Sequence, residues 1–261
     1  MLMEETKNQI PGHLRQDIST QETTKTIPSR YNGKSIEEIE IDEKSLNNTG
    51  QAIRPKGLDF DECVQYLNKK GKEQYGNHFA IHPADYEIIF KLLVYAVKDQ
   101  KNATKLNINL GKGILLSGPV GCGKTTLMSL LNQFQPKEAK HVMKTCREIS
   151  FDFIKDGYDT IHKYSTHSFG KLGNENWPRI YCFDDLGTEN SLKYYGNECN
   201  VMAEILLSRY ELFIQKKMLT HLTTNLSAME IEEIYGSRVR SRMREMFNLI
   251  AFGAAIKDKR R

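Results

Sequence analysis

The sequence has no pair of cysteines at metal-binding spacing and no long hydrophobic run. Its five cysteines are scattered over 261 residues without a C-x-x-C pair, which indicates neither a zinc site nor a disulfide framework. No run of about 18 apolar residues is present. The first residues, "MLMEETKNQI", carry acids where a secretory signal needs a basic segment. We therefore expect a cytoplasmic protein that does not associate with membranes.

The N-terminal part is also poor in large apolar residues. Residues 1–57 are rich in Thr, Glu, Lys, Asn and Gln, which predicts a flexible polar leader without a packed core. Residues 58–108 change to a helical pattern, with Asp59 at a plausible N-cap and apolar residues on one face (Tyr86, Ile89, Phe90, Leu93 and Val97). We interpret 58–108 as a small helical region that is available for docking to a partner.

From residue 109 onward, apolar runs alternate with helical patterns. Strand followed by helix, repeated, predicts an α/β fold with a parallel sheet and helices on both faces. We assign residues 109–254 to this core and 255–261 to a basic C-terminal tail. The expected strands are 113–117, 141–146, 179–183, 218–224 and 248–252, and the expected helices are 124–134, 148–163, 197–216, 227–234 and 237–246.

The stretch "GPVGCGKTT" has the spacing of a P-loop and lies between an expected strand and an expected helix. Glycines let backbone N–H groups turn toward phosphate oxygens, and a helix N-terminus adds positive charge. Lys124 would reach the outer phosphates, and the Thr125 hydroxyl would bind magnesium. We call residues 118–126 the phosphate-binding loop; its candidate ATP contacts are Gly118, Pro119, Val120, Gly121, Cys122, Gly123, Lys124, Thr125 and Thr126.

Two further strands end in polar residues. "RIYCFDDLG" ends in Asp184 and Asp185; in a P-loop protein the first acid holds Mg²⁺ together with Thr125, and the second can polarise an attacking water. Adjacent strand residues point to opposite faces, so the two carboxylates need separate tasks. "LTHLTTNLS" ends in Asn225, an amide that could orient the water or contact the terminal phosphate.

Arginines are concentrated in "YGSRVRSRMREMF". Arg238 and Arg242 share one helical face, as do Arg240 and Arg244. Four arginines on two turns repel one another, which favours anionic partners for some of them. One such partner is the triphosphate bound by a neighbouring subunit.

These stretches, together with "ILLSRYELF", resemble the DnaC/IstB group of AAA+ ATPases over roughly residues 109–252. The resemblance implies a lid-less P-loop core of AAA+ type with strand order 5-1-4-3-2, binding of ATP and Mg²⁺, and ATP-dependent homo-oligomerisation on nucleic acid. It also implies residue roles: Lys124 and Thr125 in Walker A, Asp184 and Asp185 in Walker B, Asn225 as sensor 1, and Arg242, with Arg238 second, as the arginine finger.

Several functions remain open. The first is a helicase loader in DNA replication, acting on a replicative helicase and on single-stranded DNA; the long polar leader favours it. The second is a transposition helper ATPase of a mobile element, which binds duplex DNA and a transposase. From another class, a small P-loop kinase or nucleotide switch would need no nucleic acid. A scaffold that binds ATP without turnover is also open, because Asp185 stands where many ATPases carry Glu.

Contacts to DNA have weaker support in the residues themselves. The net charge is only +4, so any basic surface must be local. The tail "KDKRR" and Arg240 and Arg244 could meet phosphates. Tyr158, Tyr164 and Phe169 could stack on unpaired bases. His162 and His167 have no carboxylate at metal-ligand spacing, and we expect no metal other than the nucleotide's Mg²⁺.

Overall fold

A five-stranded parallel sheet forms the centre of the computed structural model, which describes residues 59–172, 175–189, 192–194, 197–253 and 258–259. The sheet order is β2-β5-β8-β1-β9, which is 5-1-4-3-2 when these five strands are numbered along the chain. The predicted order is therefore confirmed, and all five expected strands are present with small shifts at their ends: β1 (Gly113–Ser117), β2 (Val142–Thr145), β5 (Tyr181–Leu186), β8 (Thr220–Thr224) and β9 (Phe247–Ala251).

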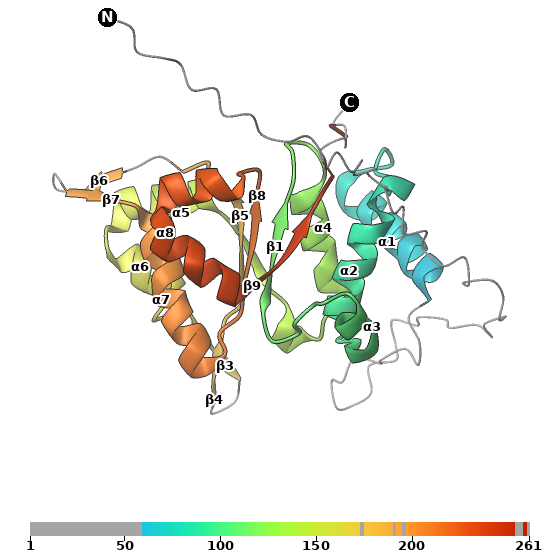
Figure 1. Ribbon diagram of the computed structural model, residues 1–261, viewed down its shortest axis with the longest axis horizontal. Helices are drawn as coiled ribbons and strands as arrows, with labels where there is room; N and C mark the ends of the chain where they lie inside the picture. The colour runs from blue at the N-terminus through green and yellow to red at the C-terminus, as the bar shows by residue number, and fades with distance from the viewer. Residues whose placement is uncertain (1–58, 173–174, 190–191, 195–196, 254–257, 260–261) are drawn as a thin grey trace, which may run out of the picture. The chain divides into compact units, whose positions relative to one another are not determined.

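Helices cover both faces of the sheet (Figure 1). Side chains alternate along β1, so Ile114 and Leu116 join one hydrophobic cluster and Leu115 joins the other. The first cluster packs against α1 (Phe60–Tyr75), α2 (Tyr86–Ala96), α3 (Gln100–Lys105) and α4 (Lys124–Leu131). The second packs against α5 (Cys146–Asp156), α6 (Asp159–Tyr164), α7 (Val201–Lys216) and α8 (Ala228–Met246).

The helices that precede the loop share the first of these clusters with β1 and α4. The boundary predicted at residue 108 is thus crossed by a common hydrophobic core. The leader at 1–57 lies outside the described residues, as does the tail except for Asp258 and Lys259. None of the helices in the described part is long and apolar enough to cross a membrane.

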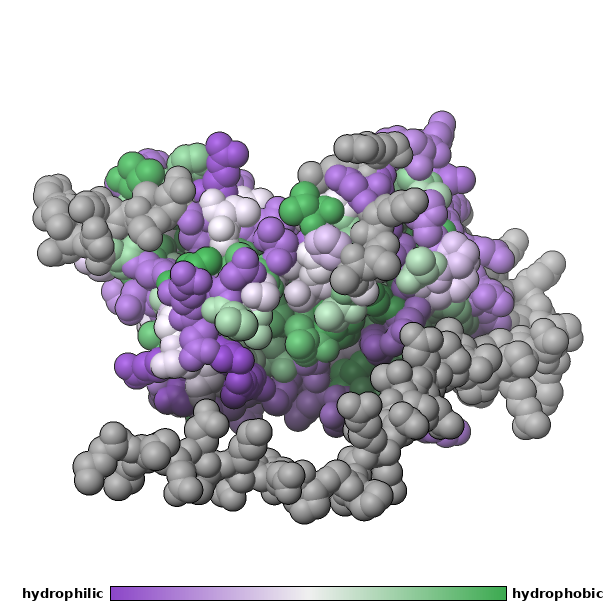
Figure 2. Space-filling view, turned by 45° about the horizontal axis from the view of Figure 1, so that its top comes forward, coloured by the Kyte–Doolittle hydropathy of each residue, from purple (hydrophilic) through white to green (hydrophobic). Residues whose placement is uncertain are grey.

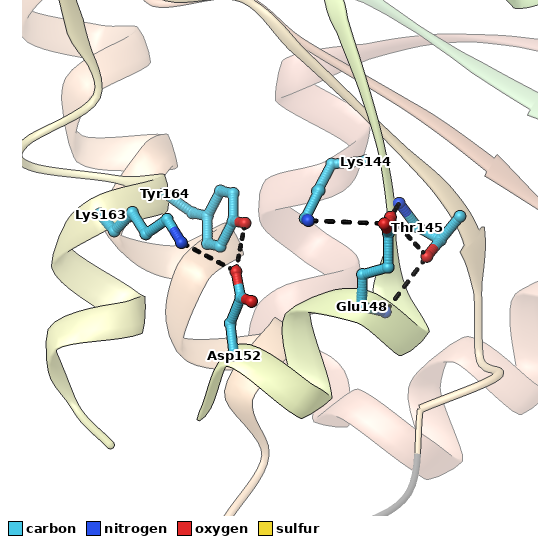
Figure 3. A network of polar contacts seen from close by, with 6 residues as sticks. All are labelled: Lys144, Thr145, Glu148, Asp152, Lys163 and Tyr164. Carbon is cyan, nitrogen blue, oxygen red and sulfur yellow. Dashed lines mark hydrogen bonds and ion pairs between the residues drawn. The ribbon is translucent and has the colours of Figure 1, made fainter. Parts of the chain in front are cut away.

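Local sequence signals explain where several helices begin. Asp59 accepts a hydrogen bond from the Glu62 N–H and caps α1 as expected. Thr145 and Glu148 form a capping box at the start of α5, and Lys144 lies 3.6 Å from the same glutamate (Figure 3). Ser227 and Glu230 form a second capping box at the start of α8.

The structure can be compared with the expected helices and strands one by one. Gly157 ends α5, so the single helix expected at 148–163 is two helices. The helices expected at 227–234 and 237–246 are both present as the two parts of α8, which are separated at Gly236 by a non-helical backbone with a φ of 84° that favours glycine. Two hairpins and three 3₁₀ turns were not anticipated: β3 (Phe169–Leu172) with β4 (Glu175–Pro178), β6 (Leu192–Tyr194) with β7 (Asn197–Cys199), and η1 (Pro83–Asp85), η2 (Asn132–Phe134) and η3 (Lys137–Ala139).

The surface is mixed in character. Hydrophobic residues are visible among hydrophilic ones on the face shown in Figure 2. Among the described side chains, Val120 in the phosphate-binding loop and Leu249 on β9 are 56% and 67% exposed. The phosphate-binding loop and the middle of the edge strand β9 therefore each present an apolar group to solvent.

Candidate nucleotide-binding site

The phosphate-binding loop wraps the amino end of α4. Gly123 is the N-cap residue with a left-handed φ of 99°, and no side chain caps the helix there. The first N–H groups of α4 therefore point toward the loop without a side-chain acceptor, an arrangement that suits an anion. The Lys124 side chain is buried, and its Nζ donates to the carbonyl oxygens of Gly118 (2.8 Å) and Pro119 (3.0 Å). The amine is thus held inside the turn of the loop.

Asp184 lies at the point where three elements meet. The Thr125 hydroxyl of α4 donates to both carboxylate oxygens, at 3.0 and 2.9 Å, and the Thr223 hydroxyl of β8 donates to Oδ1 at 2.6 Å. The carboxylate is only 2% exposed. Burial raises the pKa of Asp184, and the neighbouring Asp185 adds to this, while the two hydroxyl hydrogen bonds oppose it.

The pleat of β5 explains why Asp184 faces the loop. Tyr181 and Phe183 pack with the second cluster, whereas Cys182 packs with the first, where α4 lies. Asp184 is in phase with Cys182, so its carboxylate reaches Thr125. At Asp185 the alternation stops: the register against β8 shifts between Phe183 and Leu186, and Asp185 has a φ of 55°. The predicted separation of the two carboxylates therefore arises from a bulge as well as from the pleat.

Thr223 was missed as a site residue, although it lies in a quoted motif. Its hydroxyl accepts from the Asp185 N–H (2.9 Å) while donating to Asp184, so it connects both acids. Asn225, the residue expected in this place, is exposed just after β8. A threonine at a buried strand end was the available signal. The role of Asn225 as sensor 1 stays a prediction.

A second connection joins the loop after β5 to α8. The Glu189 carboxylate accepts hydrogen bonds from the Gly187 N–H (2.9 Å) and from the Tyr235 hydroxyl. Tyr235 is buried and directly precedes the kink at Gly236. Burial and the adjacent carboxylate raise its pKa. Sequence reasoning did not identify either residue, because neither belongs to a spaced motif.

The arginines of α8 have different surroundings. Arg238 is exposed. Arg242 is half-buried, with its guanidinium 4.5 Å from the Tyr210 ring centre and 3.7 Å from the Glu245 carboxylate. Arg240 forms an ion pair with Glu232. None of these contacts involves a residue of the phosphate-binding loop, and the roles of Arg238 and Arg242 toward a neighbour stay predictions.

The expected base-stacking residues do not form one surface. Tyr164 is buried, and its hydroxyl donates to Asp152 (2.6 Å), which also pairs with Lys163 (Figure 3). This excludes Tyr164 from stacking on a base in this conformation. Tyr158 is 47% exposed, and Phe169 lies under Lys216. Within the described ranges, no group of three His, Cys, Asp or Glu side chains could hold a metal ion.

Strand order and the place of the loop decide the type of fold. The loop connects β1 to α4, the acidic pair is at the end of β5, and β8 lies between β1 and β5. The core has an AAA+-type fold. Solved structures similar to this chain include the DnaC helicase loader (17% identity, TM-score 0.47, covering 72% of this chain and 99% of that one) and a putative primosome component from Streptococcus pyogenes serotype M3 (16%, 0.43, 67% and 83%).

Another similar structure is DnaI (18% identity, TM-score 0.39, covering 61% of this chain and 84% of that one). No protein-family model and no curated protein matches the sequence. At these identities the likeness concerns the fold alone.

Proposed function

We propose that this protein binds ATP with Mg²⁺ and hydrolyses it. The observation that carries the proposal is the meeting of Thr125, Asp184 and Thr223, which joins the helix of the phosphate-binding loop to two neighbouring strand ends. The loop's N–H groups and Lys124 would bind the phosphates. The site's remaining polar group, Asp185, is half-exposed beside them.

The donor set fits Mg²⁺, which prefers oxygen ligands and keeps several waters. The Thr125 hydroxyl and the Asp184 carboxylate would hold it, and the ion would neutralise charge on the phosphates. Thr223 keeps Asp184 oriented and, by accepting from the Asp185 N–H, fixes the backbone that carries the second acid. We assign Asp185 to polarising the attacking water and Asn225 to orienting it.

We further propose that the ATPase assembles on DNA as a homo-oligomer and acts as a loader of a replicative helicase. This rests on the motif resemblance described above and on an exposed arginine, Arg238, that is available to a neighbouring subunit. Charge on the transferring phosphoryl group can be neutralised in trans by such a residue, at a gain of about 10³-fold or more in rate.

The test is the ATPase rate per molecule against protein concentration, with no DNA, single-stranded DNA or duplex DNA. We expect the rate to rise with concentration and with single-stranded DNA, and to fall by about 10³-fold in Arg242→Ala or Arg238→Ala. Arg147→Ala, an exposed arginine on α5, is the matched control. Preference for duplex DNA would instead favour a transposition helper. A rate indifferent to concentration, DNA and both arginines would overturn assembly and favour a monomeric kinase or switch.

A further inference from the structure

Two residues near the C-terminus contact the phosphate-binding loop. The Lys259 backbone N–H donates to the Gly121 carbonyl (3.1 Å), and its Nζ donates to the Cys122 carbonyl (2.7 Å). The same Nζ lies 2.6 Å from Asp85 Oδ2. Lys259 therefore joins the loop to η1, the turn that precedes α2.

Asp85 is deeply buried for a carboxylate. Its side chain is 4% exposed and that of Lys259 is 23% exposed, so this is an ion pair largely removed from water. Among the described residues, Asp85 Oδ1 has no hydrogen-bond partner. Removing the Lys259 ammonium would leave this buried carboxylate without a compensating charge, which is strongly unfavourable.

Lys259 contacts the loop through carbonyl oxygens, not through the N–H groups that bind phosphate. In a trans peptide the C=O and the next N–H point in opposite directions. When the Cys122 carbonyl points toward Lys259, the Gly123 N–H therefore points the other way, toward the side where phosphate would bind. In the same way, the Gly121 carbonyl points toward Lys259 and the Cys122 N–H points toward the phosphate side. The Cys122 N–H makes only a long 3.5 Å contact with the Pro119 carbonyl. The contact thus orients the anion-binding donors without occupying them.

Glycine at position 121 is explained by the local backbone and by the Asp258 side chain that lies beside it. Position 121 is not fixed by the P-loop spacing, which requires glycine at 118 and 123. Gly121 has a φ of +79°, and a Cβ added there would lie 2.0 Å from Asp258 Oδ1. The positive φ itself favours glycine at position 121. A larger residue would in addition require the Asp258 side chain to turn aside.

We propose that Lys259 and Asp85 are positioning residues of the phosphate-binding loop, and that their ion pair sets the affinity for MgATP. The proposal rests on the function proposed for the loop. Lys259 acts through the backbone of residues 121–123, and Asp85 acts by holding the Lys259 ammonium against the Cys122 carbonyl.

The experiment measures the affinity of the full chain for MgATP and MgADP by calorimetry. It also measures the free energy of unfolding by urea titration. The variants are Lys259→Met, Lys259→Arg, Asp85→Asn and the double variant Asp85→Asn/Lys259→Met. Lys155→Met, which changes an exposed lysine on α5, controls for lost charge, and Lys124→Ala controls for the site. We expect Lys259→Met to weaken MgATP about tenfold, which corresponds to 1.4 kcal/mol. Lys259→Arg should restore binding to within a few-fold.

The double variant separates positioning from stability. It contains no unpaired buried charge, so it should regain urea stability relative to Lys259→Met while its affinity stays low. Wild-type affinity in Lys259→Met or in the double variant would overturn the proposal, with the nucleotide site intact. If wild type itself fails to bind MgATP, or binds no better than Lys124→Ala, the proposed function is wrong instead.

Discussion

Two buried charges lie near opposite ends of the same strands, and their partners differ in kind. Asp184, near the carboxyl end of β5, is held by the hydroxyls of Thr125 and Thr223. Arg209 on α7 is fully buried near the amino ends of β5 and β8. Its guanidinium donates to Thr220 Oγ1 (2.7 Å) and to the carbonyls of Tyr164, Leu219 and Arg179 (2.8, 2.8 and 3.1 Å).

The difference separates a structural charge from a functional one. Backbone carbonyls cannot turn away, so Arg209 is fixed for as long as the chain is folded, and burial lowers its pKa to about 9. Hydroxyls rotate, so those around Asp184 can give up the carboxylate and present their own oxygens to a cation. A buried charge with rotatable partners is therefore the better marker of a site.

Replacing Arg209 should have the largest effect. Arg209→Met leaves three backbone carbonyls without their donor, which should lower the free energy of unfolding by about 3–5 kcal/mol. Urea unfolding measures this. The nucleotide affinity of the molecules that remain folded should be unchanged, and a loss of affinity with intact stability would contradict the structural role.

Replacing Asp184 should lower ATP turnover without lowering the stability of the fold, the reverse of what we expect for Arg209. Asp184→Asn removes the carboxylate that would hold Mg²⁺, and we expect ATP turnover to fall at least about 100-fold, or 2.7 kcal/mol. Because burial already disfavours the charged form, the urea midpoint should stay the same or rise. Thr223→Val is the companion variant. If Asp184→Asn lowers the free energy of unfolding as much as Arg209→Met does, Asp184 is a structural charge as well and the contrast between the two is wrong.

Acid should destabilise the amino end of the sheet through His141. This ring is 4% exposed with both nitrogens unpaired among the described residues, it lies 5.0 Å from the His221 ring, and burial lowers its pKa to about 4. The unfolded chain takes up the proton first, so stability is complete above about pH 6.5 and falls as the pH drops toward 4.

Between pH 8 and pH 5 this one group should remove about 2 kcal/mol. His141→Met keeps a similar volume and should lose correspondingly less over the same range, as measured by urea midpoints. Asp184, whose pKa is raised, remains in both proteins and cancels in the difference. The pKa of His221 is lowered by burial and also by the neighbouring His141, so the difference reports His141 together with its effect on His221. Parallel pH profiles for wild type and variant would contradict the assignment.

The smallest expected effect concerns the Glu189–Tyr235 hydrogen bond. Tyr235→Phe keeps the ring and removes the hydroxyl, which should lower DNA-stimulated turnover about tenfold, or 1.4 kcal/mol, because the loop after β5 is no longer connected to α8 beside the kink that precedes its arginines. Tyr164→Phe, which removes another tyrosine–carboxylate hydrogen bond, the one to Asp152, is the matched control. Equal DNA-stimulated turnover in the two variants would show that the Glu189–Tyr235 hydrogen bond does not contribute to the site.

The sequence predicted the strands and the phosphate-binding loop because both depend on local patterns: apolar runs, and glycines at fixed spacing. The order of the strands in the sheet was predicted only by the family resemblance. The sequence could not predict contacts that only tertiary packing creates. Glu189 and Tyr235 are 46 residues apart, and Asp85 and Lys259 are 174 apart. Thr223 was passed over for Asn225 because only the placement of β8 between β1 and β5 shows which polar residue at the strand end reaches the acids.

The kink at Gly236 separates the second half of α8 from the first, so that the second half can change direction as a unit. Residues 237–246 form a rod of about 15 Å whose far end continues directly into β9, and β9 pairs with β1 along its whole length. The segment is therefore joined through β9 to the strand that leads into the phosphate-binding loop, and Val239 and Met243 pack it into the second hydrophobic cluster. Small twists of the β1–β9 pair would be transmitted as a change in where Arg238 points.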